Sequence, residues 1–198
     1  MPLPPNAILT QISPPSLPSP LDLDAAKAYL RIEQDDEDDL IRDMIAAATE
    51  VAAQKTGRSL GVTSWELRLD YLPGGWGAFG QGCPASIELP RPPLIAVDSI
   101  TYDDQNGTIR TLDPSTYVVI PGSPGRLAPA YGTFFPFSRP QVGSVAIRYR
   151  AGSVDTPRSV IQAIHLITAH LYEHRSDDAP IPAAVDALLS VHTWFAYS

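Results

Sequence analysis

The stretch Trp65-Glu66-Leu67-Arg68-Leu69-Asp70-Tyr71 alternates strictly between apolar and charged side chains. This period of two is typical of a β-strand with one face buried and the other in water. Before residue 57 the apolar side chains recur instead with the period of a helix, and that period returns after Pro157. The sequence therefore predicts a β-rich block between two helical segments, one from each end of the chain.

Two helices are predicted on each side of this block. The longest, residues 36–56, has one apolar face and is followed by Gly57, which suits a left-handed C-cap. Asp22 or Asp24 is expected to cap the helix before it. The third and fourth helices each begin at a proline, which is well suited to a first turn. The predicted helices cover residues 22–30, 36–56, 157–174 and 182–189.

Further strands are predicted between these helices, with Asn106-Gly107 as a hairpin turn. The connections are too short for parallel crossovers, so the strands are expected to be antiparallel. The expected strands cover residues 65–71, 86–89, 95–102, 109–112, 117–120 and 142–149. The fold class is therefore α+β. A helical core (22–60 and 155–190) is formed by the N- and C-terminal helices, and an antiparallel β-rich domain (61–152) is inserted between them.

The two ends of the chain have unusual compositions. Residues 1–21 are rich in proline and predict an extended arm that runs over the surface or onto a neighbour, with a disordered tail as the alternative. Residues 191–198 contain Trp194, Phe195 and Tyr197 and predict an extended tail that packs on its own body or docks on a partner. Neither a signal peptide nor a membrane span is expected.

Five consecutive acids, Asp35, Asp36, Glu37, Asp38 and Asp39, precede the body of the long helix. Acids in a first turn complement the positive end of the helix dipole, and the side chain of Asp35 or Asp36 is expected to cap the helix. The run lacks the alternating ligands and central glycine of a calcium loop. The acidic run and the net charge of −8 argue against a protein that binds the phosphate backbone of DNA.

The sequence contains no catalytic or cofactor motif, so no enzyme activity and no cofactor are expected. His170 and His174 share a helix face at a spacing that zinc ligands use, but no third ligand accompanies them. A metal-dependent hydrolase using this pair, or a small ligand-binding module, is the alternative function. The lone Cys83 is interpreted as a bystander thiol.

Three arginines, Arg148, Arg150 and Arg158, lie where the β-rich block meets the third helix. They could form a basic patch for a partner. Pairing with the acidic second helix is the favoured interpretation.

Taken in order, the segments resemble the head–tail connector (adaptor) proteins of long-tailed phages and phage-derived gene transfer agents. The resemblance spans about residues 21–190 and rests on the ordered combination of the segments. These are LDLDAAKAYLRIEQDDEDDLIRDMIAAATEVAAQKTGRSL, WELRLDYLP, IELPRPPLIAVDSITYDDQNG, LDPSTYVV, and RYRAG leading into PRSVIQAIHLITAHLYEHR.

The resemblance implies a structural role at the head–tail junction of a virion or phage-like particle, for a protein made in the host cytoplasm. Such proteins form a ring, commonly twelve-fold, beneath the portal. The ring extends a channel that DNA crosses without specific binding, and it joins a tail stopper or terminator.

Two sets of residues take roles from this resemblance. Portal docking would fall to the C-terminal tail, with Trp194 and Phe195 as anchors, and the acidic run would line the channel or a ring face. The docking residues would be His192, Thr193, Trp194, Phe195, Ala196 and Tyr197. The long proline-rich arm and the large β block depart from shorter members of the family.

Overall fold

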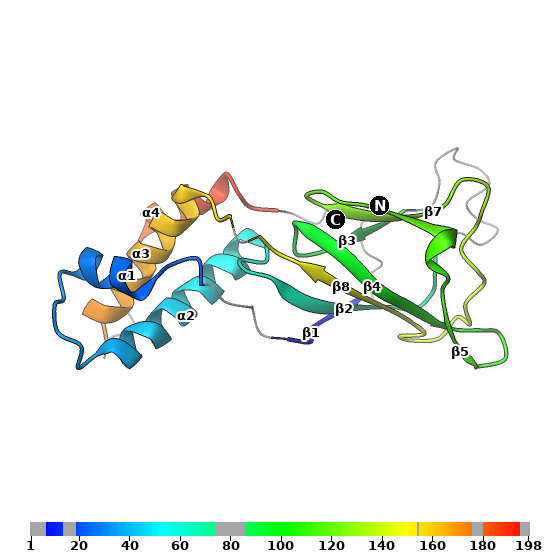
Figure 1. Cartoon of the computed structure of the whole chain (residues 1–198), viewed down its shortest axis with the longest axis horizontal. Helices are drawn as coiled ribbons and strands as arrows, with labels where there is room; N and C mark the ends of the chain where they lie inside the picture. The colour runs from blue at the N-terminus through cyan, green and yellow to red at the C-terminus, as the bar shows by residue number, and fades with distance from the viewer. Residues whose placement is uncertain (1–6, 14–18, 74–85, 154, 176–179, 195–198) are drawn as a thin grey trace. The chain divides into compact units, whose positions relative to one another are not determined.

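A computed structural model describes residues 7–13, 19–73, 86–153, 155–175 and 180–194. It divides into two compact units (Figure 1). The helical unit takes its residues from 15–62 and 153–194, and the β unit from 1–14 and 63–152. In the described residues, helices occur together with antiparallel sheets, which confirms the α+β class.

The helical unit forms because each helix buries one apolar face. The Asp22 carboxylate accepts a 2.9 Å bond from the Leu23 amide at the start of the first helix, which confirms one of the two expected caps. Gly57 ends the second helix in the left-handed region, at φ 66°, as predicted. The helices are α1 (Leu23–Leu30), α2 (Asp38–Thr56), α3 (Arg158–Glu173) and α4 (Ala183–Ser190).

The core of this unit lies mainly between α2 and α3. Ile41 and Ile45 of α2 are buried together with Ile164 and Ile167 of α3, in one apolar cluster. Val185 and other buried residues of α4 complete the cluster. These are the periodic positions that predicted the helices, so their burial follows directly from the pattern.

The β unit contains two antiparallel sheets. One has the strand order β1-β2-β8-β4-β5 and the other β3-β7-β6. The strands are β1 (Ile8–Gln11), β2 (Thr63–Leu69), β3 (Ile87–Leu89), β4 (Leu94–Asp103), β5 (Ile109–Thr111), β6 (Tyr117–Ile120), β7 (Gly125–Pro129) and β8 (Val145–Ala151). Alternate side chains such as Leu67, Ile147 and Tyr149 are fully buried in the core of this unit. The Asn106-Gly107 turn joins β4 to β5, with Gly107 at φ 80°.

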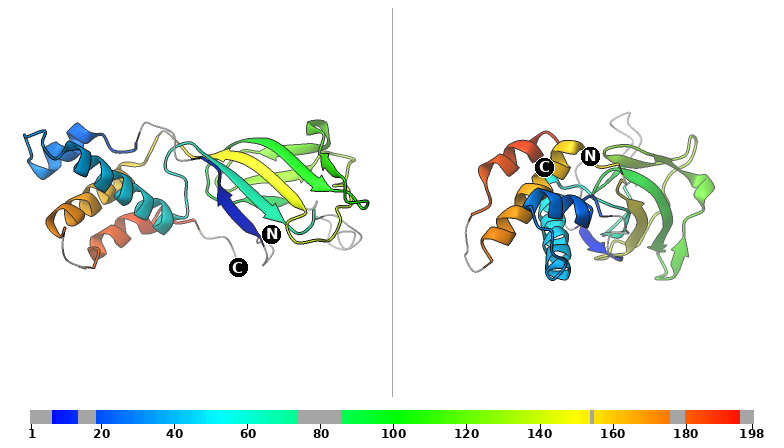
Figure 2. Two further views of the ribbon diagram at one scale, coloured as in Figure 1. Left: turned by 90° about the horizontal axis from the view of Figure 1, so that it is seen from below. Right: turned by 60° about the vertical axis from the view of Figure 1, so that its left-hand side comes forward.

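Two strands were not predicted from the sequence. β1 lies in a proline-free stretch of the N-terminal arm and pairs along the edge of β2, as the neighbouring blue and cyan strands in Figure 2 show. β7 begins at Gly125 and ends at Pro129, residues that usually indicate a turn. Both strands are defined by their pairing partners, which local composition does not reveal.

No helix in the described residues is long and apolar enough to cross a membrane.

Candidate functional site

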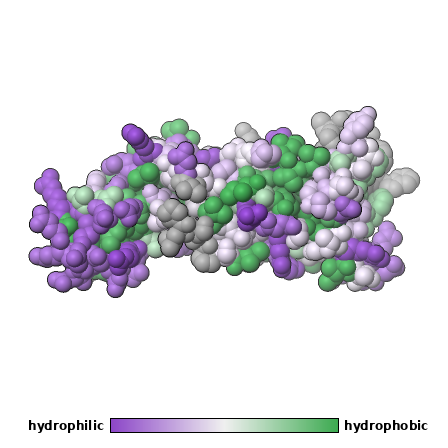
Figure 3. All heavy atoms as spheres, in the orientation of Figure 1, coloured by the Kyte–Doolittle hydropathy of each residue, from purple (hydrophilic) through white to green (hydrophobic). Residues whose placement is uncertain are grey.

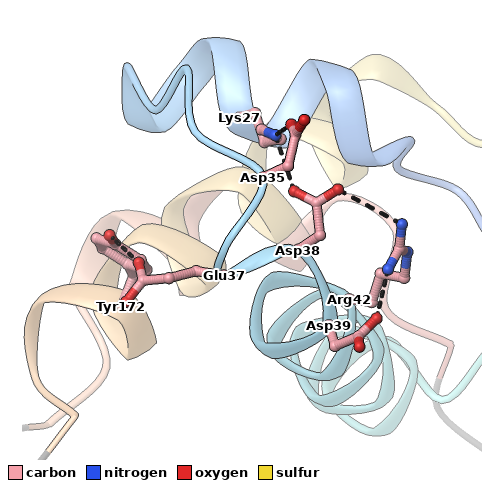
Figure 4. A network of polar contacts seen from close by, with 7 residues as sticks. All are labelled: Lys27, Asp35, Glu37, Asp38, Asp39, Arg42 and Tyr172. Carbon is pink, nitrogen blue, oxygen red and sulfur yellow. Dashed lines mark hydrogen bonds and ion pairs between the residues drawn. The ribbon is translucent and has the colours of Figure 1, made fainter.

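The acidic run at the start of α2 is built into a network of ion pairs (Figure 4). The Lys27 ammonium, on α1, lies 2.6 Å from an oxygen of Asp35 and 2.8 Å from one of Asp38. Only 9% of Lys27 is exposed, so a nearly buried cation is neutralised by two carboxylates. Arg42, one turn into α2, pairs with Asp38 and Asp39. Part of the acidic run therefore ties α1 to α2.

The expectation that Asp35 or Asp36 caps α2 through its side chain is wrong. The helix begins at Asp38, its N-cap residue is Glu37, and no side-chain capping bond is made there. The Asp38 amide donates instead to the backbone carbonyl of Asp35, at 3.2 Å. The Asp35 carboxylate turns to Lys27, because a charged ammonium is a stronger partner than a neutral amide.

Glu37 ties the start of α2 to the end of α3. One of its oxygens accepts a 2.6 Å bond from the Tyr172 hydroxyl, and the two oxygens accept 2.8 Å bonds from the Arg175 guanidinium. The bonds from Arg175 and Tyr172 lower the pKa of Glu37 from 4.5 to about 2. Neither partner was identified from the sequence, because both lie more than a hundred positions along the chain from Glu37.

Replacing Glu37 with glutamine should remove a pH-dependent part of the stability. The carboxylate has a lower pKa in the folded state, so it stabilises the fold above about pH 4.5 and loses this effect as the pH falls towards about 2. The wild type should exceed Glu37→Gln in unfolding temperature near neutral pH, and the two should converge in acid. Thermal unfolding at a series of pH values measures this. A constant difference at every pH would contradict the role of the charge.

The acidic run stays largely exposed, and acidic residues outnumber basic residues in the helical unit. The side chains of Asp35 and Asp39 are 87% and 99% exposed despite their partners, and Asp36 has no partner among the described residues. The sequence of the helical unit contains 15 acidic and 7 basic residues, whereas the β unit contains seven of each. The net charge of −8 thus belongs to the helical unit alone.

The histidines of α3 do not form a metal site. His170 and His174 face each other with ring centroids 4.5 Å apart, but no group of three His, Cys, Asp or Glu residues able to hold a metal occurs in the described part of the chain. His165 instead contacts the Tyr29 ring, and burial lowers its pKa. The hydrolase alternative therefore has no supporting geometry there, and Cys83 lies outside the described residues.

The expected pairing of the arginines with the acidic helix is wrong for two of them. Arg148 lies 2.8 Å from Glu66, and Arg150 lies 3.0 Å from Asp98. All four residues are on strands of the same sheet, where cross-strand neighbours are closest.

The C-terminal segment is anchored to the helical unit before the described residues end. Val191 and His192 form a turn, so these two residues are not extended as predicted. His192 lies 2.7 Å from the Ser159 hydroxyl, and the Thr193 hydroxyl donates to the carbonyl of Leu189. The predicted docking residues Phe195, Ala196 and Tyr197 lie outside the described residues.

Trp194 lies against the end of α2. Its amide donates a 2.8 Å bond to the carbonyl of Thr56. A Cβ at Gly57 would come within 2.8 Å of the Trp194 carbonyl oxygen, so glycine is required there for space as well as for its positive φ. Trp194 is therefore fixed against the C-terminal end of α2.

Exposed apolar side chains gather on the other unit. Figure 3 shows hydrophobic residues on the face of the β unit and hydrophilic residues over the helices. Exposed apolar residues are ordinary when they are scattered singly, whereas a contiguous patch marks a surface for contact with other proteins. The sequence patterns did not point to this surface. The large apolar residues that are exposed on the β unit are Ile8, Ile12, Tyr71, Ile95, Ile109, Val118, Ile120, Tyr131, Phe134, Phe137 and Val142.

Comparison with known proteins finds a family match over part of the chain and a shared fold over nearly all of it. Residues 20–111 match the family model of phage gp6-like head–tail connector proteins. No curated protein sequence matches significantly. The fold matches a chain in the neck of an empty gene transfer agent (GTA) particle computed with C6 symmetry, with a TM-score of 0.73 and 22% identity. That alignment covers 96% of this chain and 97% of the other.

Two more solved structures share this fold at the same identity and coverage. A chain in the virion of a native GTA particle aligns with a TM-score of 0.73, and one in the neck of a native GTA particle computed with C12 symmetry aligns with 0.67. The fold is thus shared with chains of GTA particles over nearly the whole length. Residues 20–111 match the gp6-like head–tail connector family, so the resemblance to head–tail connectors that the sequence indicated is confirmed.

Proposed function

We propose that this protein is a structural adaptor at the head–tail junction of a phage-like particle. The observation that carries the proposal is the family match at residues 20–111, extended by a fold shared along 96% of the chain with a GTA neck protein. The neck structures were computed with C6 and C12 symmetry, and a ring of identical subunits fits such symmetry. The subunits would assemble beneath the portal, contact a tail stopper or terminator, and extend the DNA channel.

The two units differ in charge and in exposed apolar side chains, so they would have different roles in this ring. The helical unit carries the whole net charge, so it is the part suited to repel DNA that must pass without being held. The β unit is neutral overall and presents most of the exposed apolar side chains, so it is the part suited to contact other proteins. The channel face would be formed by the acidic run, Asp35–Asp39.

The test of the function is co-sedimentation with the portal ring encoded in the same genomic neighbourhood. We expect stoichiometric binding of the full-length chain. A chain ending at Trp194 retains the bond from Trp194 to Thr56 but lacks Phe195 and Tyr197. If these residues dock on the portal, this shorter chain should lose at least about tenfold in affinity, because buried aromatic anchors dominate such interfaces.

The control is the substitution Val191→Ala in the full-length chain, since Val191 is exposed and is not among the proposed docking residues. Equal binding by the full-length and shortened chains would keep the adaptor role and remove Phe195, Ala196 and Tyr197 from the portal interface. If neither chain bound, the adaptor role itself would be contradicted.

Reversing two exposed charges of the acidic run should convert the repulsive surface into one that binds DNA. Asp36→Lys with Asp39→Lys changes each subunit by four charges without touching the Lys27 or Glu37 contacts. We expect the assembled variant to bind duplex DNA at low salt, with an affinity that falls steeply as salt is added. Filter binding at several salt concentrations measures this. The matched control, Asp43→Lys with Glu50→Lys, makes the same charge change further along α2; equal DNA binding by both would contradict a special role for the acidic run.

A further inference from the structure

The N-terminal strand β1 is held at the edge of its sheet mainly by its backbone. It pairs antiparallel with β2, with Ile8 opposite Arg68 and Gln11 opposite Trp65. Just beyond the strand, the Ile12 amide donates a 2.8 Å bond to the Ser64 carbonyl, and the Ser64 amide donates a 3.1 Å bond to the Ser13 hydroxyl. The edge of β2 is therefore built to receive this peptide along six residues.

The side chains of β1 contribute little to keeping the strand in place. Three of its four side chains are exposed, and Ile8 retains 51% of its surface; Leu9 alone is half-buried against the core. An edge strand of this kind is specified by its hydrogen bonds and register, which any identical peptide can reproduce. The same residues of a second copy would make the same bonds to β2.

The connection that follows β1 suits such an exchange. Nine residues separate Ser13 from Leu23 at the start of α1, and they include Pro14, Pro15, Pro18 and Pro20. Proline restricts the φ angle of the backbone, and exchanging an identical element between copies costs little because the element makes the same contacts in both arrangements. A peptide of this length reaches at most about 35 Å, which is enough to cross to an adjacent subunit.

We propose that β1 is exchanged in the assembled ring, so that Ile8–Ser13 of each subunit pairs with β2 of the next. The occupant of the β2 edge is a second copy of this chain, and the proposal rests on the adaptor function proposed above. Each subunit then donates one strand and receives one, a head-to-tail contact that is compatible with a closed ring. Neighbours in a ring are present at high effective concentration, which offsets the advantage of pairing within one chain.

A mixed disulfide tests the exchange. Two chains are prepared, both with Cys83→Ser; one carries Ile8→Cys and the other Arg68→Cys, at positions that face each other across β1 and β2. They are mixed unfolded, refolded together, assembled and oxidised. Strand exchange predicts a disulfide-linked pair of the two chains on a non-reducing gel. A mixture of Ile8→Cys with Arg126→Cys, which is exposed on β7 and does not face β1, should give no such pair.

A single chain carrying both Ile8→Cys and Arg68→Cys, with Cys83→Ser, establishes whether the two positions can be bridged at all. A ring without the mixed disulfide, together with an intrachain disulfide in this double variant, would overturn the exchange and leave the adaptor function standing. Absence of any oligomer in sedimentation would overturn both proposals. A disulfide pair as abundant with Arg126→Cys as with Arg68→Cys would also overturn the exchange.

Discussion

Ile41→Ala should lower the free energy of unfolding of the helical unit by about 3 kcal/mol. Ile41 is fully buried on α2, in the cluster that contains Ile164 and Ile167 of α3. The substitution removes three carbon atoms from this core and leaves a cavity that the flanking helices fill only partly. Urea unfolding followed by the α-helical circular dichroism signal measures the effect, because the α-helices of the described residues all belong to this unit.

Leu40→Ala is the matched control. It removes the same number of carbon atoms one residue earlier on the same helix, but Leu40 is 38% exposed. The expected loss is below about 1 kcal/mol, as for most surface substitutions. A similar loss at both positions would show that helix propensity, and not burial against α3, determines the stability of α2.

Gly125→Ala should destabilise the β unit by about 2 kcal/mol through overpacking. Gly125 begins β7, and a Cβ there would overlap the Cβ and Cδ2 atoms of Leu94 and lie 2.8 Å from its Cγ. Leu94 begins β4 in the other sheet and is only 5% exposed, so it cannot swing into solvent. The glycine is therefore required by the close approach of the two strands. Thermal unfolding followed by tryptophan fluorescence measures the loss.

The control for this clash is a double-mutant cycle with Leu94→Ala. That substitution alone should cost about 2–3 kcal/mol, because it empties a core position. In the double variant the new methyl group at position 125 no longer meets the Cγ and Cδ2 atoms of Leu94 and overlaps only the Cβ atom, so the combined loss should be smaller than the sum of the two single losses. Simple additivity would mean that contact with the outer atoms of the Leu94 side chain does not cause the effect of Gly125→Ala.

The sequence by itself determined the elements whose signal is periodic. The apolar face of α2, the alternation along β2 and the glycine at position 57 each depend on neighbours within one element, and the structure agrees with all three. The α+β class and the resemblance to head–tail connectors depend on the order of such elements along the chain, which is also a property of the sequence.

Only the tertiary structure decided which groups meet. The sequence predicts Asp35 as a possible capping residue and Glu37 as an acid that complements the helix dipole. In the structure the Asp35 carboxylate binds Lys27, and the Glu37 carboxylate binds Tyr172 and Arg175. β1 and β7 lack a strand pattern of their own and exist because β2, β3 and β6 offer them hydrogen bonds. Ion pairs and strand pairing join residues far apart in the chain, so their energy depends on distances that only folding sets.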